Sequence, residues 1–299
     1  MSIRTLSGEE LLLAGTAACP GCGAILALRL ALKALGRKTI LIIPAGCVSV
    51  SQGMAPYTAV KVPVLNIAFA ASAAAASGIV EGLDVTGVFG VTVAVWAGDG
   101  GTADIGIQAL SGAAERQTDF IYFCCDNESY MNTGIQRSSS TPFGAWTTTT
   151  PTGKREPKKD MPFIMAAHNI PYIATACSSY PVDLVEKTEM AKGFRGTKYV
   201  QVLAPCPSGW RFPAEKTIEI GRLAVETGIW PLFTIKNRKF SLSLTSERLL
   251  EGSKRRPVRE YFEAQGRFHH LSDADIDDIQ HSVSTIWDHL GQINNEDLF

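Results

Sequence analysis

The stretch VTVAVWAGDGGTADIG, residues 91–106, joins an apolar run to a glycine-rich turn and then to a helical pattern. The apolar run is rich in β-branched residues, which favours a buried strand. In the turn, Gly98, Gly100 and Gly101 surround Asp99. Ligands of parallel sheets bind beyond the carboxyl ends of the strands, so this turn predicts a phosphate site at a helix N-terminus. Asp99 adds a hard oxygen ligand suited to magnesium.

The same alternation of strand and helix recurs along the chain. Besides the run at 91–98, apolar runs predict strands at 39–45, 62–68, 119–127, 171–177, 198–206 and 231–236. Apolar residues at helical spacing predict helices at 23–36, 102–116, 181–194 and 213–228. Nearly continuous apolar strands that alternate with helices are typical of a sheet covered on both faces. The sequence therefore predicts an α/β fold with a doubly wound parallel sheet.

Two segments depart from this alternation. Residues 128–160 form a long polar stretch without a regular pattern, and a loop of this length in a compact domain is usually functional. From about residue 237 the chain becomes charged, and it ends in a helical pattern at 273–293. We expect an α/β domain over 1–236, followed by a C-terminal extension over 237–299 that packs on this domain or on partner subunits.

Composition and charge argue against a nucleic-acid-binding, membrane-spanning or secreted protein. The formal net charge of −1 gives no general attraction to nucleic acid or to an anionic membrane. Nineteen uncharged residues separate Lys61 from Glu81, but a proline, an asparagine and many alanines among them favour a strand and a packed helix over a membrane span. No secretory signal is visible at the start, where Ser7 and Glu10 match a helix cap. We expect a cytoplasmic protein, whose seven cysteines are reduced and available for metal or redox chemistry.

Four of the seven cysteines stand where ligands gather. Cys19 and Cys22 form a CxxC pair before a predicted helix, and Cys47 and Cys206 each follow or end a predicted strand. Four thiolates suit either zinc or a [4Fe–4S] cluster. One close pair with two distant single cysteines, one of them followed by proline, favours the cluster, since zinc sites more often use two close pairs. The remaining cysteines lie in apolar strands and are expected to be small buried side chains: Cys124, Cys125 and Cys177.

Asp99 gains a partner from the next predicted strand. That strand ends in CDNESYMNTG, which places Asn127 28 positions after Asp99. Adjacent parallel strands bring these two side chains to the same edge of the sheet. The combination resembles the thiamine diphosphate motif, in which GDG is followed by an asparagine-containing segment. By that resemblance, Asp99, Asn127 and the backbone carbonyl of Ser129 hold the Mg²⁺ that binds the diphosphate.

Longer motifs resemble a single family over essentially the whole chain. They are ACPGCGAILALRLALKAL (18–35), GCVSV (46–50), GDGGTADIGIQALSGAAER (98–116), DNESYMNTGIQRSSSTPFGA (126–145), PKKDMPFIMAAHNIPYIATA (157–176), LAPCPSGWRFP (203–213) and RPVREYFEAQGRF (256–268). Together they resemble the β subunit of pyruvate:ferredoxin oxidoreductase and its 2-oxoacid relatives. The resemblance implies the thiamine diphosphate-binding fold over 1–236, with Mg²⁺ and one [4Fe–4S] cluster. The implied cluster ligands are Cys19, Cys22, Cys47 and Cys206.

The resemblance also implies the reaction. Thiamine diphosphate supplies a thiazolium ylide that attacks the 2-carbonyl of a 2-oxoacid and accepts the electrons left by decarboxylation. A nearby cluster removes these electrons singly, and coenzyme A typically takes the acyl group. The implied activity is therefore oxidative decarboxylation, with pyruvate as the default substrate and ferredoxin or another carrier as acceptor. Relatives with the same motifs act on oxalate or on aryl or branched-chain 2-oxoacids, and these substrates stay open.

The chain is expected to be incomplete alone. Thiamine enzymes need a glutamate beside N1′ of the aminopyrimidine, and no motif here supplies one; Ala24 follows CPGCG. In multi-subunit members of the family, the α subunit supplies this glutamate across the interface. The implied partners are therefore an α subunit that completes the thiamine pocket and further subunits with iron–sulfur clusters. Nucleic acid and membrane are not expected as partners.

Further site residues follow from the same resemblance. Asn132 is the implied catalytic residue, with a polar contact near the reacting carbon, and a turn asparagine before Gly134 is the alternative. Gln136 and Arg137 are expected to face a partner or the substrate. The remaining expected cofactor contacts are Gly46, Cys47, Ser49, Gly98, Gly100, Gly101, Tyr130, Met131 and Thr133. The basic residues of the loop are expected to attract coenzyme A phosphates or to be solvated: Lys154, Arg155, Lys158 and Lys159.

Two other functions stay open at this point. The chain could belong to a non-redox thiamine decarboxylase or carboligase whose cysteines hold structural zinc. Alternatively, it could be a non-catalytic electron-transfer or assembly subunit that keeps the fold without thiamine. The intact GDGG turn, with Asp99 and Asn127, argues against the second alternative.

Overall fold

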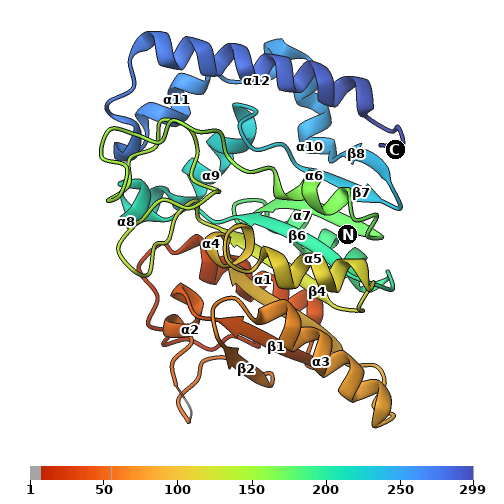
Figure 1. Ribbon diagram of the computed structural model, residues 1–299. Coiled ribbons are helices and arrows are strands. Elements are labelled where there is room, and N and C mark those ends of the chain that lie inside the picture. The colour runs from red at the N-terminus through yellow and green to blue at the C-terminus, as the bar shows by residue number, and fades with distance from the viewer. Residues whose placement is uncertain (1–7, 55, 299) are drawn as a thin grey trace.

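An eight-stranded sheet runs through the middle of the computed structural model, which describes residues 8–54 and 56–298 (Figure 1). The strand order is β2-β1-β3-β4-β6-β5-β7-β8. Six strands are parallel: β1 (Thr39–Pro44), β2 (Val64–Ile67), β3 (Thr92–Gly98), β4 (Ile121–Asp126), β5 (Tyr172–Cys177) and β6 (Lys198–Leu203). An antiparallel hairpin of β7 (Phe233–Lys236) and β8 (Lys239–Leu242) completes one edge. The predicted doubly wound parallel sheet is confirmed.

β8 is the strand that the sequence pattern misses. It is joined to β7 by Asn237 and Arg238, both at positive φ. Hairpin turns of this kind usually carry an Asn-Gly or Asp-Gly pair, so Asn-Arg gives no strong turn signal. Residues 237–299 therefore begin with a strand of the central sheet.

Helices cover both faces of the sheet. Their bounds are α1 (Gly23–Leu35), α2 (Cys47–Ser51), α3 (Ser72–Val85), α4 (Asp99–Ala103), α5 (Ile107–Glu115), α6 (Met161–Ala166), α7 (Pro181–Lys192), α8 (Pro207–Trp210), α9 (Thr217–Glu226), α10 (Leu244–Glu247), α11 (Val258–Glu263) and α12 (Asp273–Ile293). On one face, α3, α5, α6, α9 and α12 contribute to a single large cluster of buried side chains. On the other face, α1 and α7 pack against the alternate residues of the same strands. This two-sided cover explains why the strands are apolar almost throughout.

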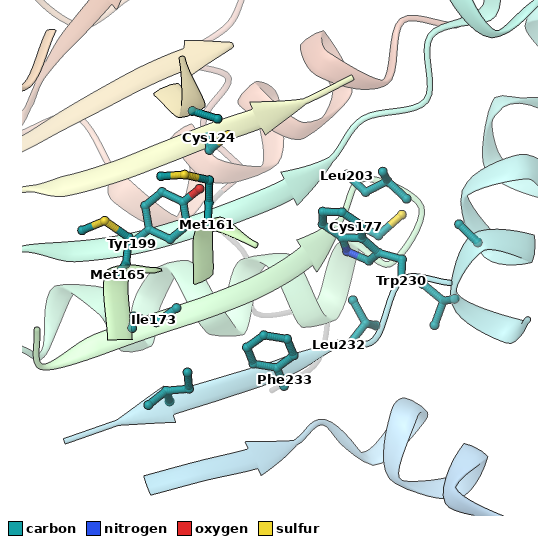
Figure 2. Close-up of a cluster of buried hydrophobic side chains, with 14 of the residues drawn as sticks. Cys124, Met161, Met165, Ile173, Cys177, Tyr199, Leu203, Trp230, Leu232 and Phe233 are labelled. Atoms are coloured by element: carbon teal, nitrogen blue, oxygen red, sulfur yellow. The ribbon is translucent and has the colours of Figure 1, made fainter. Parts of the chain in front are cut away.

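Three cysteines are buried in these cores, as the sequence predicts. Cys124 and Cys177 lie in the larger cluster, which Figure 2 shows together with Tyr199 and Trp230. Cys125, one residue further along β4, points to the opposite face and joins the smaller cluster. They act as small apolar side chains of the core.

The helix expected over 102–116 is divided into two. α4 ends at Ala103, and α5 begins at Ile107. Between them, Asp104 leaves the helical conformation, with φ −103° and ψ −94°. This break turns its carboxylate toward the long loop, where the Ser139 amide and the Tyr130 hydroxyl donate to it at 3.2 and 2.7 Å. The hydrogen bonds between Asp104 and the loop are therefore made in place of a continuous helix from α4 to α5.

The start of the chain differs from the prediction. Ser7 lies outside the described residues, and residues 8–18 contain no helix. Glu10 does not cap a helix; its carboxylate accepts from both Arg29 Nε and Nη2 at 2.8 Å on the neighbouring α1. The segment also pairs with the chain around Val60 through an isolated bridge from Leu12. Tertiary contacts therefore replace the local cap.

The C-terminal extension is part of the folded core. α12 begins where the sequence predicts, after Ser272, whose hydroxyl accepts from the Asp275 amide at 3.2 Å. In Figure 1 α12 crosses one end of the sheet, beside α11 and the β7–β8 hairpin. Trp287 of α12 is 1% exposed, and its Nε1 donates to the Gly228 carbonyl at 2.8 Å. The extension thus packs on the α/β domain itself. Within the described ranges, no helix is long and apolar enough to cross a membrane.

Replacing Trp287 by alanine should lower the free energy of unfolding by about 3–5 kcal/mol, because a large buried side chain and its hydrogen bond are lost together. Ile286→Ala is the matched control, since the neighbouring side chain is 53% exposed and its loss should change stability by less than about 0.5 kcal/mol. Urea unfolding of the purified chain, followed by circular dichroism, measures both. Equal losses in the two variants would show that α12 does not pack as described.

Candidate functional site

The predicted site residues lie at the carboxyl ends of four neighbouring strands. In the sheet order β1-β3-β4-β6, Cys47 follows β1, Asp99 follows β3, Asn127 follows β4 and Cys206 follows β6. The chain leaves β1 toward β2 on one side and returns to β3 on the other, which makes this a topological switch point. Ligands of open α/β sheets bind at such points, outside the carboxyl ends of the strands.

A cavity of about 190 Å³ lies over the glycine-rich turn. Its lining comprises Ala45, Gly46, Cys47, Phe69, Gly98, Asp99, Gly100, Gly101, Asn127, Ser129, Tyr130, Met131, Asn132 and Thr133. Nearly all of the expected cofactor contacts are therefore brought together. The exception is Ser49, whose hydroxyl accepts from the Gly46 amide at 3.0 Å and so holds the preceding turn.

Gly98 and Gly100 are needed in the turn for different steric reasons. A Cβ on Gly100 would overlap the ring of Tyr130, whose hydroxyl donates to Asp104. Around Gly98, by contrast, a Cβ would meet nothing within 4 Å on the protein side. Gly100 therefore admits the tyrosine, while Gly98 leaves the cavity open.

Three oxygen groups converge at one end of this cavity. Asp99, Asn127 and Ser129 are 1%, 8% and 4% exposed. The Asn127 side-chain amide faces Asp99 Oδ1 and the Ser129 carbonyl oxygen, and its nitrogen donates to these two atoms at 3.0 and 2.8 Å. With the amide turned over, its oxygen would replace this nitrogen and complete an oxygen cage, the set of hard oxygens that a magnesium ion prefers.

The Asp99 carboxyl is buried near a second carboxyl group, that of Asp126, and the charge of Lys158 compensates for this only in part. Burial raises the pKa of Asp99 well above its usual range, and the nearby charge of Asp126 raises it further. The Ser138 hydroxyl acts in the opposite direction by donating to Asp99 Oδ2 at 2.5 Å. A bound cation would favour the ionised carboxylate.

The four candidate cysteines also come together. Cys19, Cys22, Cys47 and Cys206 all line a second cavity of about 230 Å³. Burial, together with smaller contributions from the other three thiols, raises the pKa of the Cys47 thiol to about 12. Burial likewise raises the pKa of Cys206 to about 11. In the part of the chain that the structure describes, no group of three or more His, Cys, Asp or Glu side chains is arranged to hold a single metal ion.

The two cavities share one wall. Cys47, Asn127, Met131 and Asn132 line both of them. Asn132, the residue implied to be catalytic, is exposed at this wall. A group bound in the cavity over the turn and a group bound among the thiols would therefore be neighbours.

Most of the basic loop residues are neither solvated nor available to a ligand, which corrects the expectation from the sequence. Lys154 Nζ donates to the carbonyls of Thr141, Pro157 and Ser139 at 2.7, 3.2 and 3.3 Å. Lys159 donates to the Ala103 carbonyl. These ammonium groups tie the long loop to its own backbone and to α4, and a basic loop sequence alone does not reveal such carbonyl partners. Arg155 is exposed.

A group of buried charges beside Asn127 was not predicted. Asp126 and Glu128 flank it and form ion pairs with Lys158 and Arg267. Burial raises the pKa of Glu128, but Lys158 and Arg267 lower it more, so the net shift is downward. The four residues lie in three separate motifs, which begin at residues 126, 157 and 256, and none of these motifs indicates the pairing.

Comparison with known proteins identifies the family. Residues 44–202 match the family described as thiamine pyrophosphate enzyme, C-terminal TPP binding domain. The chain is 50% identical over 292 residues to pyruvate synthase subunit PorB of Methanocaldococcus jannaschii, covering 94% of this chain and 96% of that protein. It is 47% identical over 299 residues to ketoisovalerate oxidoreductase subunit VorB of Pyrococcus horikoshii, covering 97% of this chain and 95% of that protein.

The fold is also found among solved structures. A 2-oxoglutarate:ferredoxin oxidoreductase from Magnetococcus marinus aligns with a TM-score of 0.59 at 22% sequence identity, over 73% of this chain and 82% of that chain. The thiamine diphosphate-binding fold predicted from the sequence is therefore confirmed. With its TPP-binding domain and its identity to PorB and VorB over almost its full length, the chain belongs to the β subunits of the 2-oxoacid:ferredoxin oxidoreductases.

Proposed function

We propose that this chain carries thiamine diphosphate, Mg²⁺ and one [4Fe–4S] cluster in the oxidative decarboxylation of a 2-oxoacid. The observation that supports this most is the shared wall of the two cavities, one lined by the glycine turn and the other by four cysteines. When bound, thiamine diphosphate supplies the electron sink for decarboxylation, and a cluster supplies a one-electron acceptor. Both sites then lie within the proposed domain 1–236, with 237–299 as its packed extension.

The oxygen cage fits Mg²⁺. Asp99 Oδ1, the Asn127 amide oxygen and the Ser129 carbonyl oxygen are the proposed ligands, and the Asn127 amide, which lies 3.0 and 2.8 Å from the other two atoms, would turn its oxygen toward the cation. Gly98, Gly100 and Gly101 leave backbone close to the cavity for the diphosphate, at the N-terminus of α4. The residues present therefore suit a diphosphate bound through a divalent cation.

The cysteine cavity fits a cluster. Cys22 and Cys206 each precede the first turn of a helix, and Cys47 occupies the first position of α2. Helix N-termini favour thiolates, which offsets the burial that raises the thiol pKa values. The Gly209 amide donates to Cys206 Sγ at 3.4 Å, a contact of the kind that tunes cluster potential. All seven cysteines are free, which supports a reducing, cytoplasmic setting.

The proposed partner subunits are those that would supply a glutamate to the cavity over the turn. Among the described residues that line the cavity over the turn, none is a glutamate. We assign the N1′-contacting glutamate to an α subunit, with further cluster-bearing subunits leading to ferredoxin or another acceptor. Asn132, exposed at the shared wall, is assigned the polar contact to substrate. Coenzyme A is proposed as the acyl acceptor, bound outside the residues Lys154, Lys158 and Lys159, which have partners within the chain.

Pyruvate is the proposed substrate, in keeping with 50% identity to pyruvate synthase subunit PorB. A branched-chain 2-oxoacid is the second candidate, because identity to ketoisovalerate oxidoreductase subunit VorB is nearly as high, at 47%. Viologen reduction by the anaerobically purified native complex distinguishes them, with pyruvate, branched-chain, aryl 2-oxoacids and oxalate each tested with and without coenzyme A. Reduction by none of these acids would refute the proposed activity.

Asp99→Asn should weaken Mg²⁺-dependent binding of thiamine diphosphate by at least about 100-fold, because a charged ligand becomes neutral without a change of shape, and changes to outer-shell partners alone cost 10–100-fold. The purified complex should keep its brown absorbance near roughly 400 nm, since iron–sulfur ligation by thiolates does not involve Asp99. Calorimetric titration and absorbance spectra measure the two effects. Loss of both together would contradict the division into two sites.

Cys206→Ala should remove the absorbance band that dithionite bleaches and the iron that accompanies it, because a cluster with three thiolate ligands is incomplete. Cys177→Ala is the matched control, since this buried cysteine lies away from the cavity and should leave iron content unchanged. A colourless native complex that contains zinc would instead support the non-redox alternative.

A further inference from the structure

Four charged side chains of alternating sign, three of them buried, are linked by ion pairs beside the oxygen cage. Lys158 Nζ lies 2.8 Å from Asp126 Oδ2 and 2.9 Å from Glu128 Oε1. Arg267 Nη2 lies 2.7 Å from Glu128 Oε2. The side chains of Asp126, Glu128 and Arg267 are 0%, 4% and 2% exposed, and that of Lys158 is 23% exposed. Removing one member would leave an uncompensated charge in the interior, so the four hold one another in place.

Arg267 acts on Asn127 from two directions. Through its ion pair with Glu128, it fixes the residue that follows Asn127 in the chain. Its guanidinium carbon also lies 3.8 Å from the centroid of the Trp210 ring, and Trp210 Nε1 donates to the Asn127 carbonyl at 2.8 Å. One guanidinium therefore restrains both the backbone carbonyl of Asn127 and its neighbour.

The backbone at this point needs restraint. Glu128 has φ +66°, a left-handed conformation that is unfavourable for a residue other than glycine. Its amide donates to Asp126 Oδ1 at 3.0 Å, and its carbonyl accepts from the Thr141 hydroxyl at 2.8 Å. This conformation lies between Asn127 and Ser129, so it determines how their two oxygens face Asp99.

Arg267 itself is rigid. Its Nε donates to Gln265 Oε1 at 2.9 Å, and its Nη2 donates to the Tyr261 hydroxyl at 3.1 Å. Both partners belong to the C-terminal extension. The extension thus presents a fixed guanidinium to a loop that begins more than a hundred residues earlier, since Glu128 and Arg267 are 139 positions apart.

We propose that Arg267 is a positioning residue for divalent-cation binding: it holds Glu128 and, through Trp210, the Asn127 carbonyl so that Asn127 and Ser129 present their oxygens to the cation beside Asp99. Arg267 touches neither the cation nor the diphosphate. The proposal rests on the proposed function, in which Asp99, Asn127 and Ser129 bind Mg²⁺. A merely structural ion pair would contribute to stability without affecting the affinity for the cation.

The test uses the complex with its native partners, stripped of cation by a chelator and titrated with Mg²⁺ at saturating thiamine diphosphate in a calorimeter. Arg267→Met should raise the apparent Kd for Mg²⁺ by about 10–100-fold, as expected for loss of an outer-shell partner. Arg267→Lys should recover part of this loss, because it keeps the charge but not the planar stacking on Trp210.

Lys187→Met is the matched control. Lys187 is equally buried and pairs with Asp183 at 2.8 Å on α7, away from the cage. This variant should lower the thermal midpoint and leave the Kd for Mg²⁺ within about twofold of native, because a buried charge is left unpaired far from the cation.

Native Mg²⁺ affinity in Arg267→Met, or an equal loss in Lys187→Met, would overturn the proposal. If Arg267→Met fails to assemble, Glu128→Gln provides the same readout, since it keeps the shape of the side chain and removes the charge that Arg267 holds. A native complex that binds no thiamine diphosphate with Mg²⁺ would refute the proposed function itself, which separates that failure from failure of the positioning role.

Discussion

The site depends on one constraint: the pairing register of the adjacent parallel strands, which brings their carboxyl ends to the same edge of the sheet. β3 pairs with β4 so that Gly98 lies beside Cys125, and β4 pairs with β6 so that Asp126 lies beside Leu203. The residues that follow each strand therefore emerge at one edge, although they are far apart in the sequence. A slip of one residue in either pairing would separate the oxygen groups of Asp99 and Asn127 and exchange the side chains that face the two cores.

The acidic groups at that edge of the sheet are buried in a way that disfavours their charged forms. Asp99 is buried with a raised pKa, and the thiols of Cys47 and Cys206 are likewise raised by burial. Such groups are costly to ionise until a cation or an iron centre compensates them. Under the proposed function, binding of Mg²⁺ and of the cluster would therefore be linked to ionisation of these ligands.

Much of this arrangement could be predicted from the sequence, because it is written in local patterns. The seven predicted strands are apolar runs, and α12 has apolar residues at helical spacing. The glycine turn with Asp99 directly follows one of these strands, which places it at the edge of the sheet where ligands bind. The features that were missed depend on long-range contacts. β8 follows a turn without glycine, and the helix after the glycine turn breaks so that Asp104 can accept from the loop.

The partners of the charged residues in the long loop, and of Arg267, likewise could not be predicted from local sequence patterns. Three lysines of the basic run face backbone carbonyls or buried carboxylates, which only the folded chain brings near. Arg267 was noticed as part of a motif, yet its partner Glu128 lies in a different segment. Composition predicts a solvated surface for such residues, because charged side chains are seldom buried unless they are paired.

The long-range contacts around Asn127 also bear on the order in which the chain folds. The hydrogen bond from Trp210 spans 83 positions, and the ion pair from Arg267 spans 139. During synthesis from the N-terminus, the sheet strands up to β6 emerge before either partner of the loop has left the ribosome. Contacts of such high separation form slowly, because loop-closure entropy is lost before they are made. Arg267, the more distant partner, is therefore synthesised only after every strand of the sheet, so the loop around Asn127 gains this restraint last.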